Sequence, residues 1–410
     1  MSRAMPKWEP IEGDLATPLG FRAAAVAAGI KKTRDALDLA LIFSDSPATT
    51  AAGVFTTNRV AAAPVFVSRQ NLVNSRGRCR AIVVNSGNAN ACTGREGLQT
   101  AEETARVAAK LLAIEPSQVL VASTGVIGVA LNPDLILPQL PLLKENLTRE
   151  NAKAVAQAIL TTDRVPKTCV LRSEASGKAV HIAGIAKGAG MIHPRMATLL
   201  SFITTDASMG ERMLQNLLTE AVEDSFNRVT VDGDTSTNDT AVALASGLSK
   251  AAVIPGNESR AWFAEGLTLV CQTLARMIAR DGEGASKLVT VEIVGARTAL
   301  DADRVARAIA NSPLVKTALA GADPNWGRIL CAAGYSGTKF DPNKVDVSVN
   351  DLMLCRKGVD AGFDEAAAHR ELEGKELLLR VDLHAGKATA RVWTCDFTRD
   401  YVDINASYRS

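Results

Sequence analysis

Five short segments combine glycine with threonine, asparagine or charged side chains, the residue types from which catalytic loops are often built. They cover residues 85–90, 123–128, 187–194, 232–239 and 281–284. Most of them follow a stretch whose pattern is typical of a strand or a helix, and active sites usually form in loops at the ends of such elements. Each segment taken alone is also compatible with an ordinary turn, because glycine, asparagine and aspartate are common turn residues.

The common catalytic and metal-binding motifs are absent from the sequence. There is no G-x-S-x-G, no G-x-x-x-x-G-K-[ST] and no H-E-x-x-H. The four histidines, none at metal-ligand spacing, are His181, His193, His369 and His384. His193 lies near Thr198 and is compatible with either a catalytic or a structural role. Segment 232–239 lacks the glycine and the final glutamate of a calcium loop, so we interpret it as a polar turn or the wall of a site.

The composition is that of a globular protein without a nucleic-acid-binding surface. Of its 410 residues, 47% are hydrophobic and 22% are charged, which is enough to bury a sizeable core. The net charge is only +2 and aromatic residues make up 4%, so a nucleic-acid partner is not expected. Seven scattered cysteines without a C-x-x-C favour reduced thiols in a cytoplasm. The sequence predicts neither a signal peptide nor a membrane span.

Hydrophobic spacing predicts alternating helices and strands, and therefore an α/β protein. Helices are expected at 100–114, 211–226, 260–280 and 311–321, the first starting at a capping box of Thr100 and Glu103. Strands are expected at 81–84, 119–122, 199–203, 289–293, 377–383 and 389–395. These elements would hold the polar segments at their ends.

Residues 187–200, Lys-Gly-Ala-Gly-Met-Ile-His-Pro-Arg-Met-Ala-Thr-Leu-Leu, closely resemble the self-cleavage motif of the ornithine acetyltransferase family, also called bifunctional arginine-biosynthesis proteins. Further similar segments occur in the family's order at 85–90, 123–128, 161–163, 204–207, 232–239, 281–284, 323–328 and 405–410. Together they span nearly the whole chain. Arg195 departs from the asparagine of many members, but it is not a position to which we assign chemistry.

The resemblance implies a layered α/β sandwich of the self-processing ornithine acetyltransferase type, with a smaller α+β C-terminal domain. The chain would cut itself between Ala197 and Thr198. The α chain, residues 1–197, would carry the oxyanion hole and substrate loops. In the β chain, residues 198–285 would complete the catalytic core, 286–390 would form the smaller domain, and 391–410 would return to the active site. The resemblance also implies a heterotetramer, a dimer of α–β pairs.

The resemblance assigns a role to several individual residues. Thr198 would be the nucleophile, and Thr124 and Gly125 would form the oxyanion hole. The substrate would be contacted by Thr161, Lys187, Thr198, Glu283, Asn405 and Ser410. Thr162 is an alternative to Thr161. Considered without the resemblance, Thr124-Gly125 also suits the end of a strand, and Lys187 and Glu283 also suit solvated surface charges.

These residue types fit acyl transfer. A threonine hydroxyl is a weak nucleophile until a base takes its proton. Self-cleavage would give Thr198 an α-amino group with a reference pKa of about 7.7–8.0, which can accept that proton directly or through one water. Thr124 and Gly125 can donate to the oxyanion that forms. Lys187 and Glu283 can pair with the carboxylate and the ammonium of an amino acid.

The resemblance implies a ping-pong acetyltransferase that moves the acetyl group of N-acetyl-L-ornithine to L-glutamate in cyclic arginine biosynthesis. An extended version also uses acetyl-CoA as a donor, and the sequence does not separate the two. Apart from acetyl-CoA as a possible substrate, no cofactor and no metal are expected. The alternative is an N-terminal-nucleophile amidohydrolase or aminopeptidase of related fold, which passes the acyl group to water. A non-catalytic binding protein is the third class.

Overall fold

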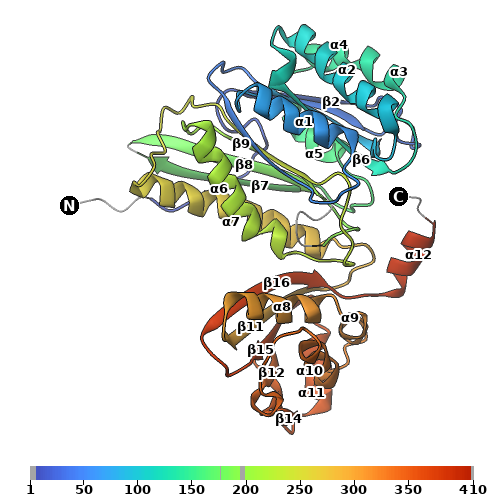
Figure 1. Cartoon of the computed structure of the whole chain (residues 1–410), viewed down its shortest axis with the longest axis vertical. Helices are drawn as coiled ribbons and strands as arrows, with labels where there is room; N and C mark the ends of the chain where they lie inside the picture. Colours follow the sequence, from blue (N-terminus) through green and yellow to red (C-terminus); the bar gives the residue numbers. More distant parts are fainter. Residues whose placement is uncertain (1–5, 176, 194–198, 408–410) are drawn as a thin grey trace.

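Two stacked sheets form the core of the larger lobe, drawn at the top of Figure 1. The computed structural model describes residues 6–175, 177–193 and 199–407. The first sheet has the order β1 (Glu9–Pro10), β7 (Lys167–Ala175), β8 (Lys178–Lys187), β9 (Leu200–Thr205), β10 (Thr240–Ala245) and β4 (Thr50–Phe55). The second has the order β2 (Phe21–Val26), β3 (Leu39–Ser44), β5 (Ala81–Asn88) and β6 (Val119–Val126). The pairs β9–β10 and β5–β6 are parallel, and the other neighbours are antiparallel.

Alternate side chains of the central strands face different layers, because successive residues of a strand point to opposite sides of its sheet. Leu200 and Phe202 of β9 belong, together with Ile42 of β3, to the core between the two sheets. Ile203 of the same strand belongs to the core on the outer face of the first sheet. Each such fully buried side chain contributes about 1.5–3 kcal/mol of hydrophobic stabilisation.

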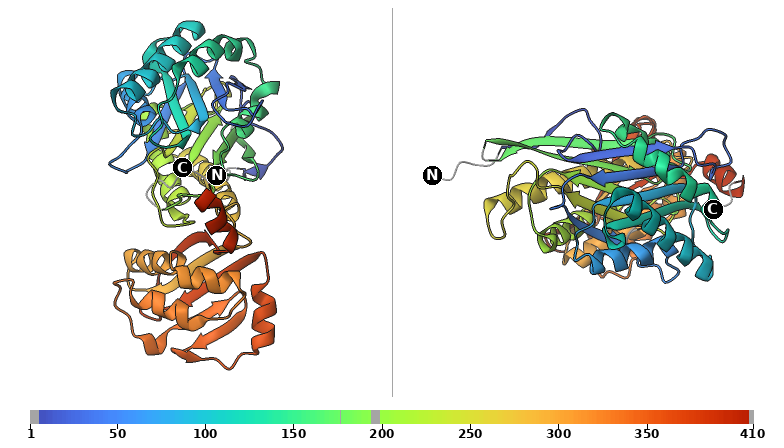
Figure 2. Two further views of the ribbon diagram at one scale, coloured as in Figure 1. Left: turned by 90° about the vertical axis from the view of Figure 1, so that its right-hand side faces the viewer. Right: turned by 90° about the horizontal axis from the view of Figure 1, so that it is seen from above.

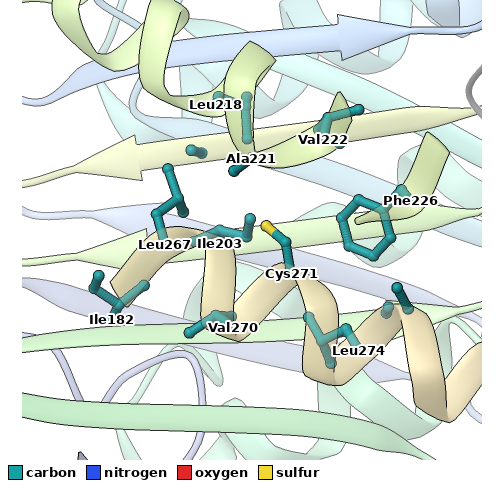
Figure 3. Close-up of a cluster of buried hydrophobic side chains, with 14 of the residues drawn as sticks. Ile182, Ile203, Leu218, Ala221, Val222, Phe226, Leu267, Val270, Cys271 and Leu274 are labelled. Carbon is teal, nitrogen blue, oxygen red and sulfur yellow. The ribbon is translucent and has the colours of Figure 1, made fainter. Parts of the chain in front are cut away.

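Helices cover both outer faces and make the lobe a four-layered sandwich. On the first sheet lie α6 (Glu211–Glu223) and α7 (Glu258–Arg280). Figure 3 shows Leu218, Ala221 and Val222 of α6 and Leu267, Val270 and Leu274 of α7 gathered over Ile182 and Ile203. The second sheet carries α1 (Ala63–Asn74), α2 (Gly94–Leu112), α3 (Pro133–Ile136) and α4 (Leu140–Glu145), while α5 (Lys153–Ala158) packs into the core between the sheets. The layered α/β architecture expected from the sequence is confirmed.

A smaller lobe with its own core follows α7 in the chain and lies below the larger lobe in Figure 1. Its sheet has the order β14 (Val359–Asp360), β13 (Leu352–Arg356), β12 (Asp346–Val349), β15 (Glu376–Asp382), β11 (Leu288–Ala296) and β16 (Ala388–Cys395). The helices of this lobe are α8 (Ala299–Ala310), α9 (Pro313–Ala320), α10 (Trp326–Gly334) and α11 (Glu365–Leu372). Residue 390, the end expected for the smaller domain, falls within β16. The last helix, α12 (Arg399–Ser407), leaves this lobe and lies beside the junction of the two lobes (Figure 2).

Three of the four helices expected from the sequence occupy the predicted positions, as α6, α7 and α9. The Ser312 side chain caps α9 by accepting from the Val315 N–H, and Gly321 follows its last residue. The start predicted for the first helix is wrong, because α2 begins at Gly94 instead of Thr100. Thr100 lies inside the helix, where its hydroxyl donates to the Glu96 carbonyl at 3.1 Å and caps nothing.

Two segments interpreted from sequence as turns are partly strand. Strand β5 continues to Asn88 and β6 continues to Val126, because the parallel pairing of the two strands persists through an irregularity at Gly87 and Asn88. The sequence therefore places these polar residues at the end of a sheet, but their strands extend farther than hydrophobicity alone predicts. All seven cysteines are free thiols. Within the described ranges, none of the helices has the length and apolar character needed to cross a bilayer.

Candidate active site

The polar segments singled out from the sequence meet around a cavity of about 180 Å³ in the larger lobe. This volume is below the about 300–1,000 Å³ typical of drug-sized ligands and suits a molecule the size of an amino acid. Six of the predicted site residues line the cavity: Thr124, Gly125, Thr161, Lys187, Glu283 and Asn405. Thr162 lines it too, so the choice between Thr161 and Thr162 stays open. These residues come from five separate parts of the chain.

The predicted oxyanion pair lies at the end of β6. Gly125 has a φ of +130°, a conformation that residues with side chains rarely adopt. A Cβ at this position would lie 2.3 Å from the carbonyl carbon of Gly87 in the neighbouring strand β5. Glycine is therefore required by the close approach of two parallel strands. Thr124-Gly125 both ends a strand and lines the cavity, so the two interpretations of the sequence are compatible.

Lys187, the last residue of β8, brings a cation into the cavity wall with only 3% of its surface exposed. Its Nζ lies 3.4 Å from the Thr124 hydroxyl and 3.9 Å from a carboxylate oxygen of Asp163. Burial lowers the pKa of Lys187, and the Asp163 carboxylate partly opposes that effect. This lysine is not the solvated surface charge that its residue type alone suggests.

Asp163 connects several segments of the site. Its carboxylate accepts hydrogen bonds from the backbone N–H groups of Thr161 (3.2 Å) and Gly188 (2.6 Å) and from the ammonium of Lys167 (2.7 Å). Burial alone would raise the pKa of Asp163, but Lys187, Lys167 and the Gly188 N–H outweigh it and lower the pKa to about 2. The carboxylate is therefore ionised at neutral pH and fixes the loop that contains Thr161.

The same network reaches the loop that follows α7. The Lys167 ammonium also contacts the Asp281 carboxylate at 2.6 Å, and Arg164 contacts its other oxygen at 3.1 Å. Asp281 precedes Glu283 by two residues, so the loop that carries Glu283 is part of this charge network. The network also reaches the loop that carries Thr161 and the end of β8. Removing one partner of such a pair leaves an uncompensated buried charge, which typically costs about 3–5 kcal/mol.

Glu283 brings a carboxylate to the cavity, where it is held between the Ala189 segment and α12. Its backbone N–H donates to the Ala189 carbonyl at 2.9 Å, and its Oε2 accepts from the amide of Asn405 at 2.9 Å. A Cβ at Gly190 would lie only 2.2 Å from Oε2, so the glycine makes room for the carboxylate. A Cβ at Gly284 would meet the backbone N of Tyr401 at 2.4 Å, so α12 packs directly on this loop.

Segment 232–238 also lines the cavity, which agrees with its interpretation as the wall of a site. Asp232 accepts from the N–H groups of Met191 (2.5 Å) and Ile192 (2.8 Å), so it holds the chain just before the predicted cleavage site. Burial raises the pKa of Asp232 to about 6, although these N–H groups oppose the change. Tyr401 of α12 completes the wall. The pKa of its hydroxyl is raised, mainly because the side chain is buried and also because carboxylates lie nearby.

Three predicted site residues, Ala197, Thr198 and Ser410, lie outside the described residues. Their predicted roles stay predictions. Sequence reasoning did not assign roles to Asp163, Asp232 or Tyr401. Asp163 and Asp232 each lie within a segment that the resemblance had singled out, and that position was the sign in the sequence that they belong to the site. For Tyr401 the sequence offers no signal beyond its closeness to Asn405.

Comparisons with known proteins agree with the resemblance seen in the sequence. The sequence profile of the ArgJ family matches residues 22–410. Arginine biosynthesis bifunctional protein ArgJ of Symbiobacterium thermophilum is 48% identical over 404 residues, covering 98% of this chain and 100% of that protein. The protein of the same name from Dehalococcoides mccartyi is 48% identical over 399 residues, covering 97% of each.

Among solved structures, the crystal structure of arginine biosynthesis bifunctional protein argJ from Bacillus halodurans is 45% identical in sequence. It covers 50% of this chain and 98% of its own, with a TM-score of 0.49. The resemblance to the bifunctional arginine-biosynthesis proteins rests on the sequence matches, which extend over nearly all of both chains. On those matches, the chain belongs to the ArgJ family.

Proposed function

We propose that this chain is a glutamate N-acetyltransferase that moves the acetyl group of N-acetyl-L-ornithine to L-glutamate, as a step of arginine biosynthesis. The observation that carries the proposal is the small cavity, which is lined by the buried Lys187, by Glu283 and by the Thr124-Gly125 pair. The names of the relatives, bifunctional proteins of arginine biosynthesis, support the same pathway.

The mechanism proceeds through a covalent acetyl-threonine. The chain first cuts itself between Ala197 and Thr198. The new α-amino group takes the proton of the Thr198 hydroxyl, whose oxygen attacks the acetyl carbonyl of N-acetylornithine. The oxyanion accepts hydrogen bonds from the Thr124 hydroxyl and the Gly125 N–H. The Thr198 α-amino group passes its proton to the α-nitrogen of ornithine, which leaves as the carbon–nitrogen bond breaks. The neutral α-amine of glutamate then attacks the acetyl-threonine, and its proton returns through the Thr198 amine to the hydroxyl. Losing one oxyanion donor typically slows such a reaction about 10²–10³-fold.

Charge complementarity orients both substrates in the same cavity. Each substrate is an amino acid or its N-acetyl derivative and carries a carboxylate that pairs with Lys187. The side-chain ammonium of N-acetylornithine pairs with Glu283, whose carboxylate is already fixed by Asn405, while the α-amine of glutamate stays free to attack the acetyl group. Thr161 and Ser410 complete the contacts. We further propose a dimer of α–β pairs, no cofactor, and acetyl-CoA as a second acetyl donor in an extended version of the activity.

Product analysis tests the proposal against the amidohydrolase alternative. The purified protein is incubated with N-acetyl-L-ornithine, with and without L-glutamate, and ornithine, N-acetylglutamate and acetate are measured. With glutamate, ornithine and N-acetylglutamate should form in equal amounts over many turnovers. Without glutamate, no more than one equivalent of ornithine per enzyme should appear. Release of acetate at an equal rate without glutamate would identify a hydrolase instead. Replacing N-acetylornithine by acetyl-CoA and measuring free CoA tests the extended version.

A further inference from the structure

One lysine of the smaller lobe is buried without an ion-pair partner. Lys316 lies on α9 and is 1% exposed. No carboxylate among the described residues forms an ion pair with its ammonium. Burial lowers the pKa of Lys316, and the nearby Cys395 and Asp396 only partly oppose that effect. A buried charge without a counter-charge is costly, so the position of this lysine needs an explanation.

The contacts of the Lys316 ammonium all fall on the segment by which the chain leaves the smaller lobe. The ammonium donates to the Thr394 hydroxyl at 2.9 Å and to the Cys395 carbonyl, at the end of β16. Its Nζ lies 4.5 Å from the centroid of the Phe397 ring, within the range of a cation–π interaction. The Phe397 N–H donates to the Lys316 carbonyl at 3.1 Å. Lys316 therefore fixes the start of the path that leads to α12.

Aromatic stacking carries this contact on to the substrate cavity. The rings of Phe397 and Tyr401 are stacked, with their centroids 4.7 Å apart and their planes at 19°. Tyr401 and Asn405 both line the cavity. The Asn405 amide donates to the Tyr401 carbonyl at 3.0 Å and to Glu283 at 2.9 Å. The lysine of the smaller lobe is thus connected, through two rings, to the side chains beside the proposed ammonium site.

Helix α12 depends on such contacts because it has little core of its own. None of its residues, which the structure describes in full, is fully buried. At its start, the Thr398 hydroxyl donates to the Gly284 carbonyl at 2.6 Å, and the Tyr401 backbone packs on Gly284. These contacts and the Phe397 ring on Lys316 set the direction in which the helix leaves the smaller lobe (Figure 1).

We propose that Lys316 is a positioning residue for the binding of N-acetyl-L-ornithine. From the smaller lobe it fixes Phe397 and Tyr401, and through them it holds Asn405 against Glu283. The smaller lobe thereby takes part in substrate recognition, although none of the described residues that line the cavity belongs to its sheet or to α8–α11.

This inference rests on the proposed function, because it takes Glu283 as the partner of the side-chain ammonium of N-acetylornithine. Glutamate has no such ammonium, so its half-reaction should not depend on the position of Asn405. The oxyanion pair, Thr124 and Gly125, lies at the end of β6 and has no part in this connection. Loss of Lys316 should therefore weaken the binding of one substrate and leave the chemical step and the other substrate unchanged.

The test measures the kinetics of the full chain with both substrates, since kcat/KM for each substrate of a ping-pong enzyme reports its own half-reaction. Lys316→Met removes the ammonium but keeps the length of the side chain. We expect kcat/KM for N-acetyl-L-ornithine to fall about 10-fold, mainly through KM, and kcat/KM for L-glutamate to keep its wild-type value.

The matched control is Lys287→Met. Lys287 is another buried lysine of this part of the chain, and its ammonium donates to the Leu319 carbonyl, away from Phe397 and α12. Both variants lose a buried ammonium bonded to a backbone carbonyl, so their melting temperatures should change by similar amounts. Lys287→Met should keep wild-type kinetics for both substrates. The same selective loss in this control would show a general effect of the smaller lobe and overturn the assignment to Lys316.

Phe397→Leu tests the same connection without removing a buried charge, and it decides the matter if Lys316→Met folds poorly. It removes the ring between Lys316 and Tyr401 and should produce the same loss, selective for N-acetylornithine. The double variant should lose less than the product of the two single losses, because both changes act through one ring. Losses that multiply would show that Lys316 does not act through Phe397.

Two further results would overturn the assignment. One is wild-type kcat/KM for N-acetylornithine in both single variants, and the other is an equal loss for the two substrates. Either result, obtained with a wild-type chain that makes N-acetylglutamate, leaves the proposed acetyltransferase intact. A wild-type chain that makes none would instead remove the proposed function, and the inference with it.

Discussion

The side-chain amide of Asn405 donates a hydrogen bond of 2.9 Å to Oε2 of Glu283, 122 residues earlier in the chain. This bond ties α12, which follows the smaller lobe, to the loop at the end of α7 in the larger lobe. The close packing of Gly284 on the Tyr401 backbone supports the same contact. The end of the chain thereby returns to a cavity formed mainly by the larger lobe, and it holds the carboxylate proposed to bind the substrate ammonium.

Removing this hydrogen bond should weaken substrate binding more than it weakens the fold. Asn405→Ala frees the Glu283 carboxylate, and a hydrogen bond to a charged group contributes about 1.5–3 kcal/mol. We expect kcat/KM for N-acetylornithine to fall about 10–100-fold, mainly through KM, with an unchanged melting temperature. Asp403→Ala, an exposed position on the same helix, is the control and should keep wild-type kinetics. Equal kinetics of both variants would show that Asn405 does not position Glu283.

Gly190 should tolerate no side chain. The Cβ of Gly190→Ala would lie within 2.6 Å of the whole Glu283 carboxyl group, which must then move away from the cavity. We expect kcat/KM to fall at least about 100-fold, since small displacements of positioned groups have effects of that size. Gly334→Ala, where nothing lies within 4 Å, is the matched control for steady-state kinetics. Wild-type kinetics of Gly190→Ala would mean that the position of Glu283 is unimportant.

Lys187 should recognise the substrate carboxylate through its charge. Lys187→Met keeps the length and most of the apolar contacts of the side chain but removes the ammonium. We expect kcat/KM to fall about 10–100-fold for both N-acetylornithine and glutamate, because both carry a carboxylate. Lys178→Met, at the exposed start of the same strand, is the control. A loss confined to one of the two substrates would contradict a shared carboxylate site.

Asp163 should make the fold sensitive to acid. Its folded-state pKa of about 2 lies below the model-compound value of 3.8, so its ionised form stabilises the fold by about 2 kcal/mol. That contribution is complete above about pH 4 and is lost as the pH falls through 2. Urea unfolding from pH 2 to 7 should show this dependence in the wild type and lack it in Asp163→Asn.

At pH 7, Asp163→Asn should also lower the free energy of unfolding by about 3–5 kcal/mol, because Lys167 and Lys187 lose their shared partner. The double variant Asp163→Asn with Lys167→Met removes one charge of each sign and should recover part of the loss. No recovery in the double variant would show that the hydrogen bonds to Thr161 and Gly188 matter more than the charges.

The sequence predicted most of the fold because its helices and strands carry clear hydrophobic periods. The helix from Glu258 to Arg280 keeps an apolar face over its full length, and that face packs on the first sheet. The start of α2 was missed because Thr100 and Glu103 have the spacing of a cap, although residues from Gly94 onward are already helical. Local patterns cannot tell a capping threonine from one that bonds within the helix.

The substrate-binding candidates were also accessible from sequence, but only through the family resemblance. Residue type alone suggested that Lys187 and Glu283 were surface charges, since burial of a charge depends on partners far away in the chain. Lys187 meets Thr124, 63 residues away, and Asp239 meets Leu199, 40 residues away. The second contact follows from the sheet order, which puts β9 beside β10, whereas the first joins β8 to β6, which belong to different sheets.

The central claim is that Thr198, freed by self-cleavage, carries the acetyl group between substrates. The most direct measurement is the intact mass of the denatured protein after brief incubation with N-acetyl-L-ornithine alone. We predict two chains, residues 1–197 and 198–410, with the second heavier by one acetyl group that disappears when glutamate is added. A single uncut chain of 410 residues, or a cut β chain that never gains an acetyl group, would contradict the account.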